Sequence, residues 1–245
     1  SSTSRGLGDV YKRQMSTPIK SINDDKTITT EYCSKYGFKE GGYYYFFNVL
    51  EELDIPGEYY IDRDDGILYF CPPDENENSK ILLSTSNENI ISITEKASNI
   101  TIDGLTLQGT RSDALMVAGE NCKIVNCTIK NAAECGINVS GKNNFVENCE
   151  VTFIGKDAVI LSGGSEEGFV YGNNTVTNNS LHDYGEIQKT YIAGVNLSGI
   201  GNTVSHNEIY NAPHMGIYYT GNENIMEYNY IHDVVLQSSD AGAIY

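Results

Sequence analysis

Short apolar segments recur along residues 99–245, with every second residue apolar inside each segment and polar or glycine-containing stretches between them. This alternation is the period of a β-strand, and no segment keeps a helical period over about ten residues. The apolar segments return about every 22 residues, which leaves room for three very short strands in each repeat. The pattern therefore predicts an all-β chain made of repeated short strands.

Three positions keep their spacing in every repeat. The first, an apolar position, is Ile102, Ile124, Val146, Val176, Val204 and Met226. The second, three residues later, is Leu105, Cys127, Cys149, Asn179, Asn207 and Asn229. The third, two residues further on, is Leu107, Ile129, Val151, Leu181, Ile209 and Ile231. Units this small must bury their apolar side chains against equal units above and below, so we expect a right-handed parallel β-helix whose asparagines form an inward ladder at a bend.

Two repeats are longer than the others, because Gly163–Phe169 and Tyr184–Thr190 interrupt the pattern without breaking it. Such interruptions are typical of loops that project from the corners of the coils. We expect the first strands of the β-helix at residues 81–83 and 90–93.

The chain before the repeats has a different pattern. Residues 15–80 alternate aromatic and polar residues around turn signals at Pro56-Gly57 and Asp65-Gly66, which predicts a β-hairpin with strands near residues 57–61 and 67–70. The expected organisation is a β-rich flanking or cap-like segment over 15–80 and a β-helix over 81–245. Residues 1–14 resemble translated adaptor sequence and are expected to be a non-native or disordered leader. The chain stops at Tyr245 within an apolar β pattern, so we expect the β-helix to be truncated there.

The charge balance narrows the choice of partners. The formal net charge is -17, from 16 Lys+Arg and 33 Asp+Glu, and it repels nucleic-acid backbones and anionic membranes. No apolar run is long enough for a membrane span, and no export signal is found. The six cysteines lack the spacing of a zinc site, so we expect buried free thiols, no metal site and no cofactor.

A further small residue follows the third position in each repeat: Ala114, Gly136, Ala158, Gly194, Gly216 and Gly242. Strand alternation predicts that this line faces outward and forms a shallow trough for a sugar chain. Two residues earlier the predicted outward column is Ser112, Glu134, Lys156, Ile192, His214 and Asp240. His214 and Asp240 would lie on adjacent coils within hydrogen-bond reach, an arrangement suited to acid–base catalysis.

Two further outward columns are predicted. One is Met116, Asn138, Ile160, Asn196, Tyr218 and Ile244, in which Tyr218 offers a stacking face and Asn196 an amide for sugar hydroxyls. The other is Lys130, Thr152, His182, Tyr210 and His232, a mostly solvated face with Glu150, Glu208 and Tyr230 beside it. His232 and Asp233 would share the coil of Asp240 and assist its site. Asp113 and Asp157 are expected to satisfy backbone amides at a corner.

Three segments carry a resemblance to a known family. Asn48–Pro73, Asn211–Asp233 and Ser238–Tyr245 resemble, in this order, the bacterial right-handed β-helix glycoside hydrolases, including β-xylosidase-like and fucosidase- or xylanase-like enzymes. The resemblance implies that Asp240 is a catalytic carboxylate and His214 an active-site polar residue. It matches His232 and Asp233 to the family's I-H-D segment, and it implies a second carboxylate one or two coils beyond Asp240.

The function expected on these grounds is hydrolysis of a plant-type polysaccharide or oligosaccharide by an Asp carboxylate pair, in a secreted or periplasmic protein. A non-catalytic carbohydrate-binding or structural β-helix is the main alternative. A polysaccharide lyase is less favoured, because Lys156 stands in its column without the acidic trio that a calcium-assisted lyase needs. The oligomeric state is not predicted.

Overall fold

The computed structural model of the chain describes residues 5–8, 15–33, 46–73, 81–238 and 241–245, and it divides the chain into two units, Ser1–Ile81 and Leu82–Tyr245. The first unit contains an antiparallel sheet in the order β3 (Ile28–Thr30), β2 (Met15–Ile22), β1 (Arg5–Gly8), β4 (Phe46–Phe47). A short 3-10 helix, η1 (Leu50–Glu52), follows. Its second sheet is the hairpin β5 (Tyr59–Asp62) and β6 (Ile67–Phe70), which confirms the predicted hairpin.

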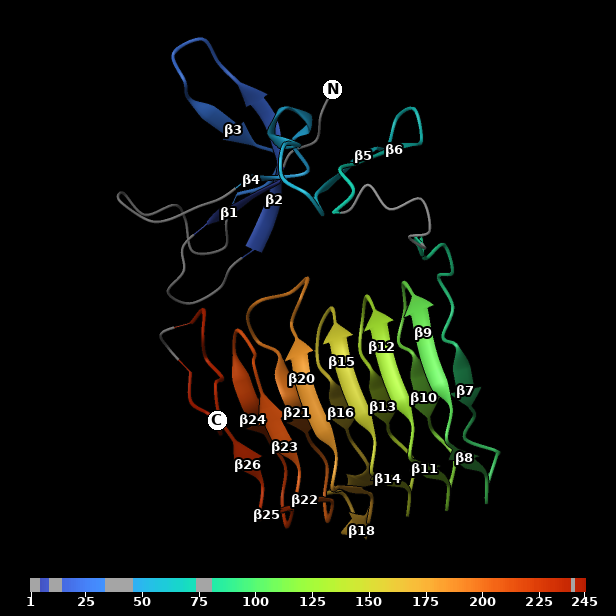
Figure 1. Cartoon of the computed structure of the whole chain (residues 1–245). Coiled ribbons are helices and arrows are strands. Elements are labelled where there is room, and N and C mark those ends of the chain that lie inside the picture. Colours follow the sequence, from blue (N-terminus) through green and yellow to red (C-terminus); the bar gives the residue numbers. More distant parts are fainter. Residues whose placement is uncertain (1–4, 9–14, 34–45, 74–80, 239–240) are drawn as a thin grey trace. The chain divides into compact units, whose positions relative to one another are not determined.

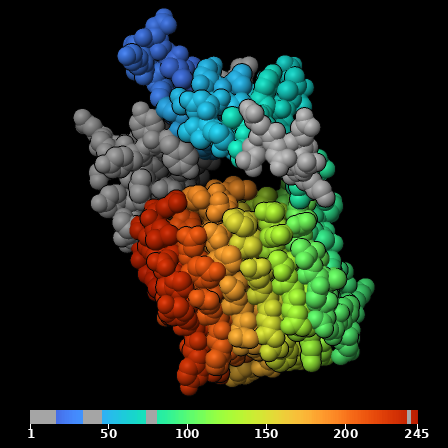
Figure 2. Space-filling view, in the orientation of Figure 1, coloured from blue at the N-terminus to red at the C-terminus, as the bar shows by residue number. Residues whose placement is uncertain are grey.

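The second unit is a parallel β-helix with three six-stranded sheets, and its coils follow one another as bands from green to red (Figures 1 and 2). Sheet I is β7 (Ile91–Ile93), β10 (Leu115–Val117), β13 (Ile137–Val139), β16 (Val159–Leu161), β21 (Ala193–Leu197) and β24 (Met215–Tyr219). Sheet II is β8 (Thr101–Asp103), β11 (Lys123–Val125), β14 (Phe145–Glu147), β19 (Thr175–Thr177), β22 (Thr203–Ser205) and β25 (Ile225–Glu227). Sheet III is β9 (Thr106–Thr110), β12 (Thr128–Ala132), β15 (Glu150–Ile154), β20 (Ser180–Tyr184), β23 (Glu208–Tyr210) and β26 (Tyr230–Ile231).

The strand register confirms the predicted repeat. Residues at the first position pair with one another from coil to coil along sheet II, from Ile102 to Met226. Residues at the third position pair in the same way along sheet III, from Leu107 to Ile231. These side chains form one buried core with the inward residues of sheet I. Each fully buried Ile, Leu or Val stabilises the fold by about 1.5–3 kcal/mol relative to an exposed one, so adjacent coils hold each other in place.

The predicted asparagine ladder lies at the bend between sheets II and III. Asn207 Oδ1 accepts hydrogen bonds from Asn179 N at 3.0 Å and from Asn179 Nδ2 at 2.9 Å. Asn229 Oδ1 accepts the same two bonds from Asn207, each at 3.0 Å. A second ladder, which the sequence analysis missed, occupies the bend between sheets I and II: Asn144, Asn174, Asn202 and Asn224. In both ladders the side-chain oxygens accept hydrogen bonds from backbone N–H groups that have no strand partner at the bend.

The two insertions are loops, as predicted. The first carries the small hairpin β17 (Gly164–Ser165) and β18 (Val170–Tyr171) between sheets I and II. The second lies between β20 and β21, at the bend from sheet III into sheet I. It begins after Tyr184, which ends β20 and is fully buried, with its hydroxyl donating to the Met215 carbonyl at 2.7 Å.

Three expectations about the fold are wrong. Residues 81–83 form no strand, and their side chains are exposed, so β7 is the first strand of sheet I. Ile244 rather than Ala243 pairs with Ile217, because the last coil is one residue longer between its strands than the alignment assumed. The cysteines are free, but Cys33 is exposed and Cys71 is half-buried, so only Cys122, Cys127, Cys135 and Cys149 match the expected burial.

Candidate functional site

The bend from sheet III into sheet I gathers histidines and carboxylates on the later coils. On the outer face of sheet III, His182, Tyr210 and His232 follow one another on successive strands because their neighbours Leu181, Ile209 and Ile231 point inward. The His182 and Tyr210 ring centres are 4.7 Å apart, and those of Tyr210 and His232 are 5.0 Å apart, with planes inclined by 13° and 4°. The last three members of the predicted outward column therefore form a ring stack, whereas Thr152, which was predicted to lie on the same solvated face, is buried.

Each of these histidines lies between two carboxylates. Asp183 Oδ2 is 2.5 Å from His182 Nδ1, and Glu150 Oε1 is 3.7 Å from its Nε2. Asp233 Oδ2 is 2.8 Å from His232 Nδ1, and Glu208 Oε1 is 3.3 Å from its Nε2. The hydrogen bond to Asp233, with a smaller contribution from Glu208, raises the pKa of His232 above its usual range. His232 is thus held as a cation over a wider pH range than a free imidazole.

His214 differs from its neighbours because it is buried. Its side chain is 5 % exposed, which contradicts the predicted outward orientation. His214 lies in the bend just before β24, where the alternation of a strand does not set the direction of a side chain, and its ring points into the protein. Burial lowers the pKa of His214, and a hydrogen bond to the Ile192 backbone offsets part of this effect. Within the described part of the chain, its Nδ1 has no hydrogen-bond partner.

Backbone hydrogen bonds join His214 to the coil of His232. Ala212 N donates to the Asp233 carbonyl at 3.1 Å, and Val235 N donates to the His214 carbonyl at 2.8 Å. The loop between β20 and β21 adds Tyr191, whose ring centre lies 6.0 Å from that of His214. Asp240, the predicted catalytic carboxylate, lies outside the described residues.

The predicted trough is absent, since its small residues face the interior. Ala114 and Ala158 are fully buried, and Ile192, a member of the other predicted outward column, is 1 % exposed. A side chain at Gly194 would meet Ile209 Cγ2 at 2.4 Å, and one at Gly216 would meet Ile231 Cγ2 at 2.5 Å. These positions are small because the chain turns tightly over the core there.

The outer column of sheet I is as predicted up to Tyr218. Met116, Asn138, Ile160, Asn196 and Tyr218 pair in register, and all are half-buried.

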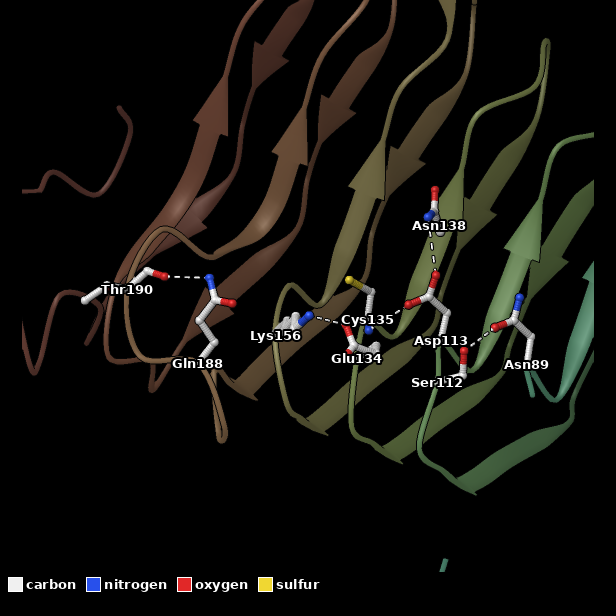
Figure 3. A network of polar contacts seen from close by, with 9 residues as sticks. All are labelled: Asn89, Ser112, Asp113, Glu134, Cys135, Asn138, Lys156, Gln188 and Thr190. Carbon is white, nitrogen blue, oxygen red and sulfur yellow. Dashed lines mark hydrogen bonds and ion pairs between the residues drawn. The ribbon is translucent and has the colours of Figure 1, made fainter. Parts of the chain in front are cut away.

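The two asparagines of this column contact a carboxylate on the preceding coil. Asn138 Nδ2 donates to Asp113 Oδ2 at 3.3 Å (Figure 3). Asn196 Nδ2 lies 3.5 Å from Asp157 Oδ1. Asp113 also accepts the Cys135 amide at 3.0 Å, and Asp157 the Ala193 amide at 2.8 Å. Both aspartates thus satisfy corner amides, as predicted.

Lys156 forms an ion pair with Glu134 on the neighbouring coil (Figure 3). This hydrogen bond raises the pKa of Lys156, which makes it a poor general base. Among the residues that the structure describes, no group of three or more His, Cys, Asp or Glu side chains is arranged to hold a metal ion.

Asp183 is the main polar residue of this bend that the sequence analysis missed. The sequence did indicate this residue, because one apolar-His-Asp pattern occurs twice, two coils apart, as Leu181-His182-Asp183 and Ile231-His232-Asp233. Both aspartates have a left-handed backbone, with φ of 50° and 48°, which turns the chain and brings each carboxylate onto the preceding imidazole.

Comparison with known proteins identifies the family. The family model for the right-handed β-helix region matches residues 60–181 and 114–244, and the chain belongs to this family. No curated protein matches the sequence. Handedness and fold class are therefore as predicted.

Solved structures resemble the chain at low sequence identity, and the first of them shares its fold. One described as a glycoside hydrolase has a TM-score of 0.77 and 13 % identity, and the match covers 100 % of this chain and 57 % of that chain. XylC in complex with xylose has a TM-score of 0.44 and 11 % identity over 75 % of this chain and 43 % of its own. An alginate lyase from Paenibacillus has a TM-score of 0.40 and 12 % identity over 57 % and 65 %. The chain thus spans a little over half the length of the glycoside hydrolase structure.

Proposed function

We propose that this chain forms part of a glycoside hydrolase that acts on a plant-type polysaccharide or oligosaccharide. The observation that carries the proposal is a pair of histidines on successive coils with opposite pKa shifts. Burial lowers the pKa of His214, whereas hydrogen bonds to Asp233 and Glu208 raise the pKa of His232. Groups whose surroundings move their pKa values apart are typical of sites that transfer protons.

In this proposal Asp240 acts as one carboxylate of a pair, either protonating the leaving oxygen or attacking the sugar. His214 lies next to residues 233–235, and its Nδ1 offers a hydrogen bond that positions a carboxylate or a sugar hydroxyl. His232 and Asp233 bind hydroxyl groups, Asn196 contributes its amide, and Tyr218 stacks on a sugar ring. No cofactor takes part. The solved glycoside hydrolase of the same fold supports this class, and the acidic charge disfavours nucleic-acid and membrane partners.

The site of action would be outside the cell or in the periplasm, where polymeric glycans are met. Within the described residues no helix is long and apolar enough to cross a membrane.

A non-catalytic glycan-binding β-helix is the second candidate. It is favoured by the ring stack, because both nitrogens of His182 and of His232 already face carboxylates. A lyase is less favoured, since Lys156 is engaged by Glu134.

The test is hydrolysis of a panel of aryl glycosides, xylosides and fucosides foremost, by the protein with its natural flanking sequence. Asp240→Asn should abolish turnover and leave oligosaccharide binding intact. Asp103→Asn, on the outer face of sheet II, is the matched control and should keep full activity. Absence of turnover on every sugar, with binding retained in all three proteins, would favour the binding module.

A further inference from the structure

The two chain neighbours of His214 contact the start of the loop that joins β20 to β21. Met215 follows His214, and its carbonyl accepts a hydrogen bond from the Tyr184 hydroxyl at 2.7 Å. Pro213 precedes His214 and lies against Gly185, since a side chain added at Gly185 would meet Pro213 Cγ at 2.8 Å. Tyr184 and Gly185 therefore contact the chain on both sides of His214.

Tyr184 differs from the equivalent residues of the earlier coils. These are smaller, and they pair in register with it along sheet III: Thr110, Ala132 and Ile154. The Tyr184 side chain is fully buried, and the Gly194 backbone N–H donates to its oxygen. A side chain at Gly194 would begin 3.2 Å from that oxygen, so glycine leaves room for the hydroxyl. The hydroxyl thus links β21 to β24 from inside the core.

Sheet I changes at the same coil. The strands β10, β13 and β16 have three residues each, whereas β21 and β24 have five. The two added residues stand at the start of each longer strand, where Ala193 pairs with Met215. Met215 is the residue whose carbonyl Tyr184 binds. The link therefore fixes the start of β24, directly after His214.

The end of the same loop contacts the imidazole itself. The ring centre of Tyr191 lies 6.0 Å from that of His214, and a hydrogen bond joins His214 to the Ile192 backbone. The loop is in turn held by the preceding coil, because Gly185 N donates to the Lys156 carbonyl at 3.0 Å. One anchored loop thus contacts His214 and both of its neighbours.

We propose that Tyr184 is a positioning residue for His214, and that the loop between β20 and β21 clamps this imidazole in its buried orientation. Because Tyr184 is fully buried, it acts through the Met215 carbonyl and not on a sugar. The part that His214 takes in glycan cleavage rests on the proposed function, whereas the clamp rests on the contacts of Tyr184 and Gly185. A small displacement of a group that acts on the substrate lowers the rate of reaction.

The test compares Tyr184→Phe with the unmodified protein, both with their natural flanking sequence. The variant keeps the ring and loses the hydroxyl, so the start of β24 loosens and water reaches His214. An NMR titration should show the pKa of His214 rising toward its ordinary value, because burial lowers it in the unmodified protein. On aryl glycosides, kcat should fall about tenfold with little change in KM.

Tyr228→Phe is the matched control. It removes the hydroxyl of an exposed tyrosine at the bend between sheets II and III, away from the loop. This variant should keep the pKa of His214, kcat and KM of the unmodified protein.

The pKa of His214 separates a clamp from a merely structural tyrosine. A Tyr184→Phe protein that is less stable but keeps the pKa of His214 overturns the proposal. A raised pKa supports the clamp even when the unmodified protein hydrolyses no sugar, a result that would count against the proposed function alone. If Tyr184→Phe does not fold, Gly185→Ala tests the clamp from the Pro213 side. Its methyl group displaces Pro213, and an unchanged pKa of His214 in that variant equally overturns the proposal.

Discussion

Asp157 illustrates how one buried carboxylate makes the fold sensitive to pH. Its burial raises its pKa to about 6, although the Ala193 amide and Asn196 stabilise the charge. The folded protein therefore holds a proton that the unfolded chain releases near pH 4, and stability falls as the pH rises through this window. Asp157→Asn should remove this slope, which amounts to about 3 kcal/mol. Chemical denaturation at a series of pH values measures it, and parallel curves for the two proteins would contradict the account.

The two histidines of the candidate site, His214 and His232, provide a second prediction about single residues. Titration followed by NMR should place the pKa of His214 below 6.5 and that of His232 above it. Because the folded pKa of His232 is raised, its stabilising effect is fully present below the unfolded value and is lost as pH rises through the folded value. Glu208→Gln should lower the pKa of His232 and leave that of His214 unchanged. A shift of both would show that the two rings are not independent.

Single residues also mark the limit of the sequence analysis. The strand period placed Tyr218 and His232 on outer faces, because both lie within or directly after regular strands. It failed for His214 and Ile192, which lie in the bend, where alternation gives no direction. The position of Asp183 depended on a left-handed backbone that the apolar pattern does not reveal.

Among the structural elements, the asparagine ladder at the bend between sheets II and III is the clearest test of how coils are joined. Asn207 accepts two hydrogen bonds from Asn179 and donates to Val176 and Asn229, and it is 1 % exposed. Asn207→Ala leaves buried amides without partners and should lower the free energy of unfolding by about 2–4 kcal/mol. The half-buried Thr203→Ala on β22 should change it by less than about 0.5 kcal/mol. Equal effects would mean that the ladder adds nothing to the packing.

The repeat made most of the strands predictable, since equal positions must stack once the period is known. The last coil was aligned one residue out, because Ser238–Tyr245 contains no asparagine anchor to fix its register. The second ladder was predictable as well, because its asparagines all stand two residues before the first apolar position of their repeats: Asn144, Asn174, Asn202 and Asn224.

At the scale of the whole molecule, the proposed glycan cleavage would take place at one bend of a solenoid whose other faces serve structure or binding. The sheet pattern predicted the fold, and the charge of -17 disfavoured nucleic-acid and anionic-membrane partners, but neither indicated which bend carries the site. That choice rests on the two histidines: burial at the bend lowers the pKa of His214, whereas hydrogen bonds to Asp233 and Glu208 raise the pKa of His232.

The most direct measurement is an NMR titration of the histidine ring signals with an oligosaccharide, in Asp240→Asn to prevent turnover. The chain has four histidines, and His206 stacks on Tyr228 at the bend between sheets II and III, so it is an internal control. The account predicts that His214 and His232 shift together at saturable glycan concentrations while His206 does not move. Shifts confined to His206, or saturable binding that moves neither His214 nor His232, would contradict a glycan site at this bend.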